Sequence, residues 1–262
     1  MIRSLNTAEQ AMERQQVRID ALANNLANVN STGFKQILTR VAESGGQDVQ
    51  DISPDGNARG ISVAQRLTQG DAWARQPKLN LYLATDIRNG PVKATGRDTD
   101  VAIIGRGFFA LQGEDGETYT RSGGFRLDET KTLVSPEGLP VLSDSGPIVI
   151  DGNDFDIKND GTVMVDGASV GQLKLVDFAD ATKMEHLGSN RLRPPVDMEP
   201  QPVPPAEIAV AQGHLEGSNV NAIDTLVSMI EAQRAFEIQS KITMTEDEML
   251  SKSVNKLPQV SG

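Results

Sequence analysis

A run of apolar residues at helical spacing opens the chain and limits what it can fold into. The positions that recur in steps of three and four, of which only Gln15 is polar, are Leu5, Ala8, Met12, Gln15, Ile19, Leu22, Leu26 and Val29. Apolar a and d positions sustained over four heptads predict a coiled-coil-like helix. Gly33 follows it and favours a left-handed cap at the helix end. No second helical segment adjoins it in the sequence, so its partner must come from elsewhere.

A second helical segment lies at the other end of the chain, from Val220 to about Leu257. Ser218 or Asn219 is a suitable N-cap, and Asp224 favours the helix dipole. Pro258 ends the segment. Two apolar sets, joined through Arg234, mark one face: Ile223, Val227 and Ile230, then Ile238, Ile242, Thr245 and Met249. The two terminal helices must therefore pair with each other or with other molecules.

The interior is different in kind, because short β-branched or aromatic runs alternate with glycine turns from about residue 97 to 178. Asp115-Gly116, Asp160-Gly161 and Asp166-Gly167 indicate hairpins. The predicted fold class is α+β, with paired terminal helices and a mostly antiparallel β domain between them. The expected parts are a helix (1–35), an extended arm (36–90), the β domain (91–193), a proline-rich linker with a return strand (194–217) and a helix (218–262).

Charge and hydropathy exclude several partners. The formal net charge of −11 argues against nucleic acid and anionic membrane surfaces. No run of eighteen apolar residues is present, so no membrane insertion is expected. The N-terminus has no continuous apolar region of a cleavable signal. We therefore expect a cytoplasmic chain or one exported without such a signal.

Three stretches could carry chemistry, and none develops into a site. Gly105-Arg-Gly107-Phe-Phe-Ala110 has the spacing of a pyrophosphate loop, but Gly113 and Gly116 interrupt the helix that such a loop needs. The acidic residues 151–161 lack the ligand order of a calcium loop. His186 and His214, the only histidines, lie far apart. The sequence predicts no catalytic, cofactor-binding or metal-binding residue, and no enzyme.

Asparagines crowd the end of the first helix although Asn is a mediocre helix former. Asn24, Asn25 and Asn28 flank Leu22 and Leu26. Polar amides beside an apolar seam can fix register and partner number at some cost in stability. We interpret them as assembly specificity toward other chains. The alternative is an intramolecular helical hairpin.

Three motifs carry a resemblance to a known family. Residues 22–35 (LANNLANVNSTGFK) resemble the N-terminal signature of the bacterial flagellar basal-body rod and hook proteins. Residues 215–221 (LEGSNVN) and 229–236 (MIEAQRAF) resemble their C-terminal signature. Residues 100–109 and 119–125 are similar to the opening of their middle β domain. Only the 36–90 arm and the proline linker stay unmatched.

The resemblance implies a structural subunit of the axial drive shaft that transmits torque from motor to hook. It also implies export through the flagellar type III apparatus, a place in the periplasm-spanning rod, and partners among copies of itself and neighbouring rod and hook proteins. On this basis Leu5, Met12, Ile19, Leu22 and Leu26 are expected to pack against Ile223, Val227, Ile230, Ile238 and Ile242. Assembly contacts are further expected from Asn24, Asn25, Asn28, Phe34, Ser218 and Asn219.

The position along the axis is less closely defined. The opening Met1–Leu5 is similar to a distal rod protein, whereas residues 90–97 and 139–150 are more similar to a proximal one, which we favour. Two other classes remain as alternatives. A self-contained β-domain protein with a helical hairpin would protect both helices in the monomer, and a nucleotide-binding enzyme would bind its ligand at residues 105–110.

Overall fold

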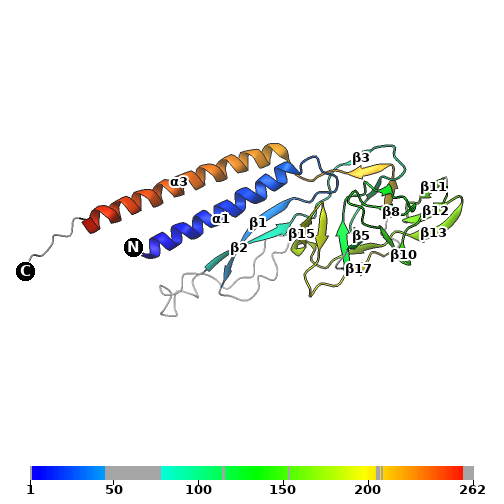
Figure 1. Cartoon of the computed structure of the whole chain (residues 1–262), viewed down its shortest axis with the longest axis horizontal. Coiled ribbons are helices and arrows are strands. Elements are labelled where there is room, and N and C mark those ends of the chain that lie inside the picture. Colours follow the sequence, from blue (N-terminus) through cyan, green and yellow to red (C-terminus); the bar gives the residue numbers. More distant parts are fainter. Residues whose placement is uncertain are drawn as a thin grey trace, which may run out of the picture. The chain divides into compact units, whose positions relative to one another are not determined.

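The computed structural model describes residues 2–44, 78–113, 116–152, 154–204, 207 and 209–255 (Figure 1). The chain divides into two compact units, one of residues 1–38 and 84–262 and the other of residues 39–83. The larger unit contains a helix near each end of the chain and the strands of a β region between them. The predicted α+β class, with a mostly antiparallel β region, is confirmed.

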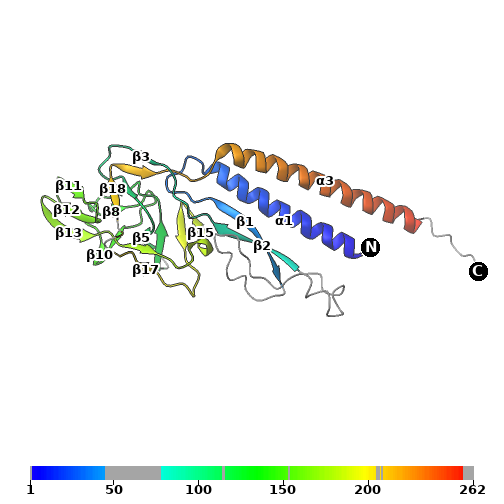
Figure 2. The same cartoon turned by 180° about the vertical axis from the view of Figure 1, so that it is seen from behind.

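The terminal helices α1 (Ile2–Ala27) and α3 (Ala222–Asn255) lie side by side, as both Figure 1 and Figure 2 show. No glycine or proline interrupts either helix, so nothing in the sequence breaks the helical hydrogen bonding. Gln15, the one polar position in the predicted seam, donates from Nε2 to the carbonyl of Ala232 at 3.0 Å. This bond joins the two helices directly.

The end of α1 differs from the prediction. The helix stops at Ala27, and the Asn28 side-chain nitrogen donates to the carbonyl of Asn24 at 2.9 Å, beside the Asn28 backbone nitrogen, which donates to the same carbonyl at 3.2 Å. Gly33 does adopt a positive φ of 67°. It serves a close approach of two backbones, because a Cβ there would lie 2.3 Å from the Ser122 nitrogen.

The predicted contact face of α3 is not the one that packs within the chain. Ile223, Val227, Ile230, Ile238 and Ile242 are exposed by 46–72%. Most buried and half-buried positions form another seam, which also advances in steps of three and four: Ala222, Thr225, Met229, Ala232, Phe236, Gln239 and Thr243. Most of these side chains are short or polar. They allow close helix packing and leave the bulky aliphatic side chains outside.

A six-stranded antiparallel sheet is the largest element of the β region. Its strands, in spatial order, are β15 (Glu185–Gly188), β16 (Arg191–Arg193), β6 (Gly116–Thr120), β5 (Phe108–Gly113), β14 (Leu175–Asp177) and β17 (Gln201–Pro202). A three-stranded sheet contains β11 (Phe155–Ile157), β12 (Thr162–Val165) and β13 (Ala168–Gln172). The Asp166-Gly167 turn between β12 and β13 has positive φ at both residues, as predicted for a hairpin.

Short pairs complete the region. They are β3 (Val92–Ala94) with β19 (His214–Glu216), β4 (Val101–Ile103) with β18 (Val210–Gln212), β7 (Arg126–Leu127) with β8 (Leu133–Val134), and β9 (Leu142–Ser143) with β10 (Gly146–Pro147). A 3-10 turn, η1, spans Ala181–Lys183. Because β18 and β19 pair with the first strands of the region, the chain returns to its entry point just before α3 begins.

The core of the β region consists of two clusters of buried apolar side chains. In the larger one, the rings of Phe109 and Phe125 meet edge to face with their centroids 5.1 Å apart. In the smaller one, Tyr119 meets Phe178 in the same way at 4.9 Å. Phe108 and Phe109 are neighbours on β5, and successive side chains of a strand point to opposite faces. Phe109 therefore belongs to the larger cluster and Phe108 to the smaller one.

The proline-rich segment does more than link. Gln201–Pro202 forms the edge strand β17, where proline is tolerated because one side needs no donor. Val203 is buried in the larger cluster, and its nitrogen donates to the carbonyl of Leu175 at 3.1 Å. The segment is thus partly integrated into the sheet.

The smaller unit contains most of the predicted arm. Its described strands, β1 (Ile37–Ser44) and β2 (Lys78–Thr85), form a two-stranded sheet whose ends lie in the larger unit. Residues 78–85 of the predicted extended arm therefore form a strand. Residues 45–77, Pro258 and Asp115, on which other predictions fell, lie outside the described residues.

Candidate functional site

A buried cluster of charges lies where the segment after α1 and the segment before α3 meet the β region. Lys35 follows α1, Arg121 follows β6, and Glu216 ends β19 just before α3. The Glu216 carboxylate accepts from Lys35 Nζ at 2.8 Å and from Arg121 Nε at 2.5 Å. It also accepts from the backbone nitrogen of Gly90 at 2.8 Å. All three charged side chains are at most 2% exposed, so the cluster is sealed from water.

Arg121 explains Gly105 and Gly107, the two glycines with the spacing of a pyrophosphate loop, which lie at a bend before β5. Its guanidinium donates to the carbonyls of Gly107 and Gly105, and to that of Ile103 at 3.1 Å. Both glycines have a φ near +107°, which L side chains rarely adopt. The bend therefore presents carbonyl oxygens to a cation, whereas a pyrophosphate would need amide donors. The strand β5 follows the bend directly, where a nucleotide loop would start a helix.

Burial and charge together shift the pKa values of Glu216 and Lys35. Burial acts to raise the pKa of Glu216, but the nearby charges and hydrogen bonds of Arg121 and Lys35 outweigh it and hold the pKa below its usual value. Burial is also the main cause that lowers the pKa of Lys35, opposed by Glu216. The cluster therefore holds two cations against one anion, and Glu216 is the residue that balances it.

Two asparagines bind the backbone around this cluster. Asn25 is fully buried and exchanges two hydrogen bonds with Ile37, one to its carbonyl and one from its nitrogen, each 2.7 Å long. Asn219 accepts from the nitrogen of Gln36 at 2.8 Å and donates to the carbonyls of Asp86 and Arg88, each at 2.9 Å. Both amides are thus engaged within the chain. Only their assembly role stays a prediction.

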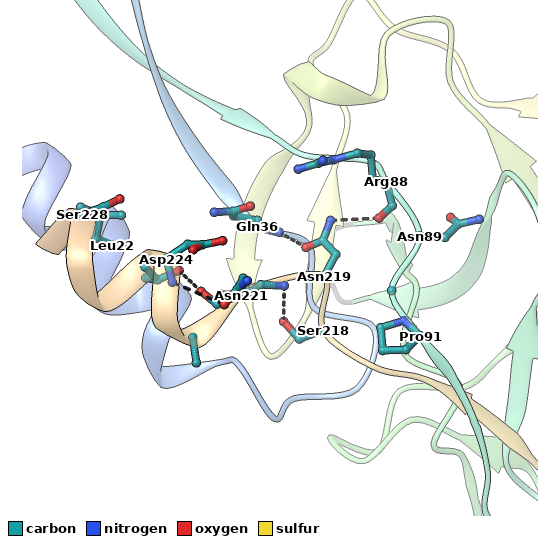
Figure 3. A pocket seen from close by; sticks show the side chains of 14 residues that line it. Leu22, Gln36, Arg88, Asn89, Pro91, Ser218, Asn219, Asn221, Asp224 and Ser228 are labelled. Carbon is teal, nitrogen blue, oxygen red and sulfur yellow. Dashed lines mark hydrogen bonds between the residues drawn. The ribbon is translucent and has the colours of Figure 1, made fainter.

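Figure 3 shows the start of α3, where Ser218, Asn219 and Asn221 line a cleft together with Arg88 and Pro91. Asn221 is the N-cap, because its side-chain oxygen accepts from the nitrogen of Ile223 at 3.0 Å. The two residues that were expected to cap the helix make other hydrogen bonds. Ser218 Oγ accepts from the nitrogen of Val220 at 3.2 Å, and Asn219 bonds to three backbone groups. A cleft of about 760 Å³ opens between this helix start, Leu22 of α1 and the loop of residues 88–91.

Phe34, for which an assembly contact is predicted, is buried within the chain. Its ring centroid lies 5.9 Å from that of His186 on β15, and His186 Nε2 lies 3.1 Å from Thr85 Oγ1. Burial lowers the pKa of His186. The Phe34–His186 ring contact thus packs the segment just before Lys35 against the β region.

The remaining predicted residues lie on the helices. Met12, Ile19, Leu22 and Leu26 are half-buried on α1, and Leu5 lies ahead of the residues whose side chains are described. Asn24 and Asn28 bond each other at the helix end, 3.1 Å apart. The five aliphatic residues of α3 form an exposed stripe with Arg234 in its middle, here called the outer stripe.

Sequence reasoning missed Lys35, Arg121, Glu216 and Asn221. Lys35 and Glu216 each stood inside a quoted motif, so a charged residue in an otherwise apolar or small-residue motif was the available signal. In the described part of the chain no group of three or more potential metal ligands gathers. Within that part, neither helix is apolar enough over a sufficient length to cross a membrane.

Three family models match the chain in sequence order. They are "Flagella basal body rod protein" at residues 5–35, "Flagellar hook protein FlgE/F/G D1 domain" at residues 102–165 and "Flagellar basal body rod FlgEFG protein C-terminal" at residues 211–257. The range matched by the first model ends at Lys35, and the range matched by the last contains Glu216. The Lys35–Glu216 ion pair therefore connects the two terminal regions that the family models match.

Relatives that match nearly the whole chain are also named flagellar basal-body rod proteins. The flagellar basal-body rod protein FlgG of Bacillus subtilis is 34% identical over 97% of this chain and 99% of its own length. FlgF of Caulobacter vibrioides is 34% identical over 93% of each chain. FlgG of Borreliella burgdorferi is 33% identical over 95% of this chain and 97% of its own.

Proposed function

Because the chain belongs to the flagellar basal-body rod protein family, we propose that it is built into the rod through α1 and α3. Its relatives are named as structural basal-body proteins, and the chain is a structural rod subunit, not an enzyme. The self-contained hairpin protein and the nucleotide-binding enzyme are not favoured. We further propose which surfaces of the two helices form the contacts between subunits.

The outer stripe of α3 carries this proposal. Five branched aliphatic side chains lie exposed along one helix face, and single exposed residues would not form such a line. Covering apolar surface contributes about 25 cal/mol per Å². A stripe that stays uncovered in one chain is a surface for neighbouring helices. In the assembled rod, α1 and α3 would pack with those of adjacent subunits in a coiled-coil-like tube, with the β region outside it.

Further proposals follow from the family. The chain would be exported through the flagellar type III apparatus without a cleaved signal, join neighbouring rod and hook proteins in the periplasm-spanning rod, and transmit torque from motor to hook. We favour a proximal position in the rod. The amides of Asn24 and Asn28 would add specificity at the margin of the helix contacts.

The test substitutes one residue of the stripe. In a strain that lacks the chromosomal copy, Ile230→Asp is expected to leave the purified chain folded, because Ile230 is 46% exposed, yet to prevent its recovery in isolated basal bodies. Gln233→Asp places the same charge on another exposed position of α3 and should be recovered normally. Circular dichroism checks the fold of both. Normal recovery of Ile230→Asp would contradict the assembly role of the stripe.

A further inference from the structure

α3 carries two seams of different period. The inner seam, from Ala222 to Thr243, advances 21 residues in six steps, or 3.5 residues per step. The outer stripe runs through Ile223, Val227, Ile230, Arg234, Ile238, Ile242, Thr245 and Met249, which is 26 residues in seven steps, or about 3.7. A 3.5-residue period favours left-handed winding, whereas one near 3.67 favours straight or right-handed winding. The two seams therefore suit two different partner helices.

Arg234 interrupts the outer stripe with a charge. It is exposed, one turn from Ile230 and one from Ile238. No ion pair joins it to another residue in the described ranges. A helix laid on the stripe would bury this guanidinium, and a buried charge needs a partner of opposite sign. The covering helix must therefore bring a carboxylate among short side chains.

The outer face of α1 has this composition. Its exposed positions, in steps of three and four, are Glu13, Gln16, Asp20, Ala23 and Ala27. The two alanines leave room for branched side chains from another helix. Asp20 stands one turn before Ala23, and the only hydrogen bond described for its carboxylate comes from Gln16, at 2.9 Å. The half-buried Ile19 and Leu26 border this face and add apolar contact.

We propose that the outer stripe of α3 receives α1 of a second copy of this chain, with Asp20 of that copy paired to Arg234. This inference rests on the proposed function and assigns the occupant of the stripe. Each subunit would then use the inner seam of α3 for its own α1 and the outer stripe for that of its neighbour. Charge and shape complementarity would select this helix over a second α3, whose own Arg234 would meet like charge.

Cysteine cross-linking tests the pairing, because the chain has no cysteine of its own. Asp20→Cys and Arg234→Cys are placed on separate copies and expressed together, and basal bodies are isolated and oxidised. A disulfide-linked dimer is expected only when both variants are present. A dimer with Arg234→Cys alone, or no dimer although both variants are incorporated, would overturn the assignment. Absence of the unmodified chain from basal bodies would instead overturn the proposed function, and the pairing with it.

Charge reversal gives a second readout. Arg234→Glu is expected to lower recovery in basal bodies by about tenfold, because two carboxylates would then face each other. Combining it with Asp20→Arg should restore recovery, while Glu13→Arg should not. Rescue by Glu13→Arg, or none by Asp20→Arg, would refute Asp20 as the partner.

Discussion

Glu216 balances two buried cations, and its replacement tests the buried charge cluster. In Glu216→Gln the side chain keeps its size but loses its charge, leaving Lys35 and Arg121 buried beside each other. Removing one partner of a buried ion pair costs about 3–5 kcal/mol. Domains of this kind are stable by about 5–15 kcal/mol, so the loss would be large. We expect the free energy of unfolding, measured in urea at pH 7, to fall by about 3–5 kcal/mol.

The pH dependence of this loss follows from the lowered pKa of Glu216. A carboxylate with a lowered folded pKa contributes stability above its unfolded value, near 4.5, and loses it as the pH falls through the folded value. The difference between wild type and Glu216→Gln should therefore shrink below about pH 4.5. Lys35→Met leaves Arg121 and Glu216 as a balanced pair and should cost less than Glu216→Gln.

The control is Asp151→Asn, which removes an 83% exposed carboxylate paired with Lys131. It should leave the denaturation midpoint unchanged. A loss below about 1 kcal/mol for Glu216→Gln, or one that stays constant into acid, would refute the reasoning. The first result would mean that water or a shifted side chain replaces the carboxylate.

Two further predictions concern single residues near the cluster. Asn25→Ala removes both hydrogen bonds to Ile37 and should lower the free energy of unfolding of the unassembled chain by about 1–3 kcal/mol; an unchanged urea midpoint would contradict the intrachain role. Burial holds the pKa of His186 below 6.5, so the unfolded chain takes up that proton first. Stability should fall as the pH drops below about 6.5 and through the lowered folded pKa, and His186→Gln should flatten that slope in urea titrations; an equal slope would contradict it.

Local rules in the sequence predicted much of the fold. The heptad spacing of α1, the hairpin turns and the antiparallel β region all follow from periods and turn residues that act over a few positions. The helix ends were less well predicted. Asn221 caps α3 where Ser218 or Asn219 was expected, because side chains next to a helix compete for its free backbone groups, and several polar residues there qualify equally. The helix α1 ends at Ala27, several residues before the predicted end of the segment.

The contact face of α3 and the buried cluster required tertiary information. Both faces of α3 repeat at helical spacing, and hydrophobicity favoured the aliphatic one, whereas the face that packs in the chain has short side chains such as Ala232. Lys35 and Glu216 stand 181 residues apart in the sequence, and no local pattern relates them. Their pairing depends on β19 returning to β3 at the start of the β region.

The position of the buried charge cluster connects it with the proposed assembly surfaces of α1 and α3. Lys35 comes eight residues after the end of α1, and Glu216 comes six before the start of α3. Asn219 adds a bond to Gln36 at 2.8 Å, so the segments that lead from both helices are held by the same buried groups. If each subunit offers α1 to one neighbour and the outer stripe of α3 to another, these two surfaces must keep a fixed relation. Weakening the cluster should therefore reduce assembly even though none of its residues lies on an assembly surface.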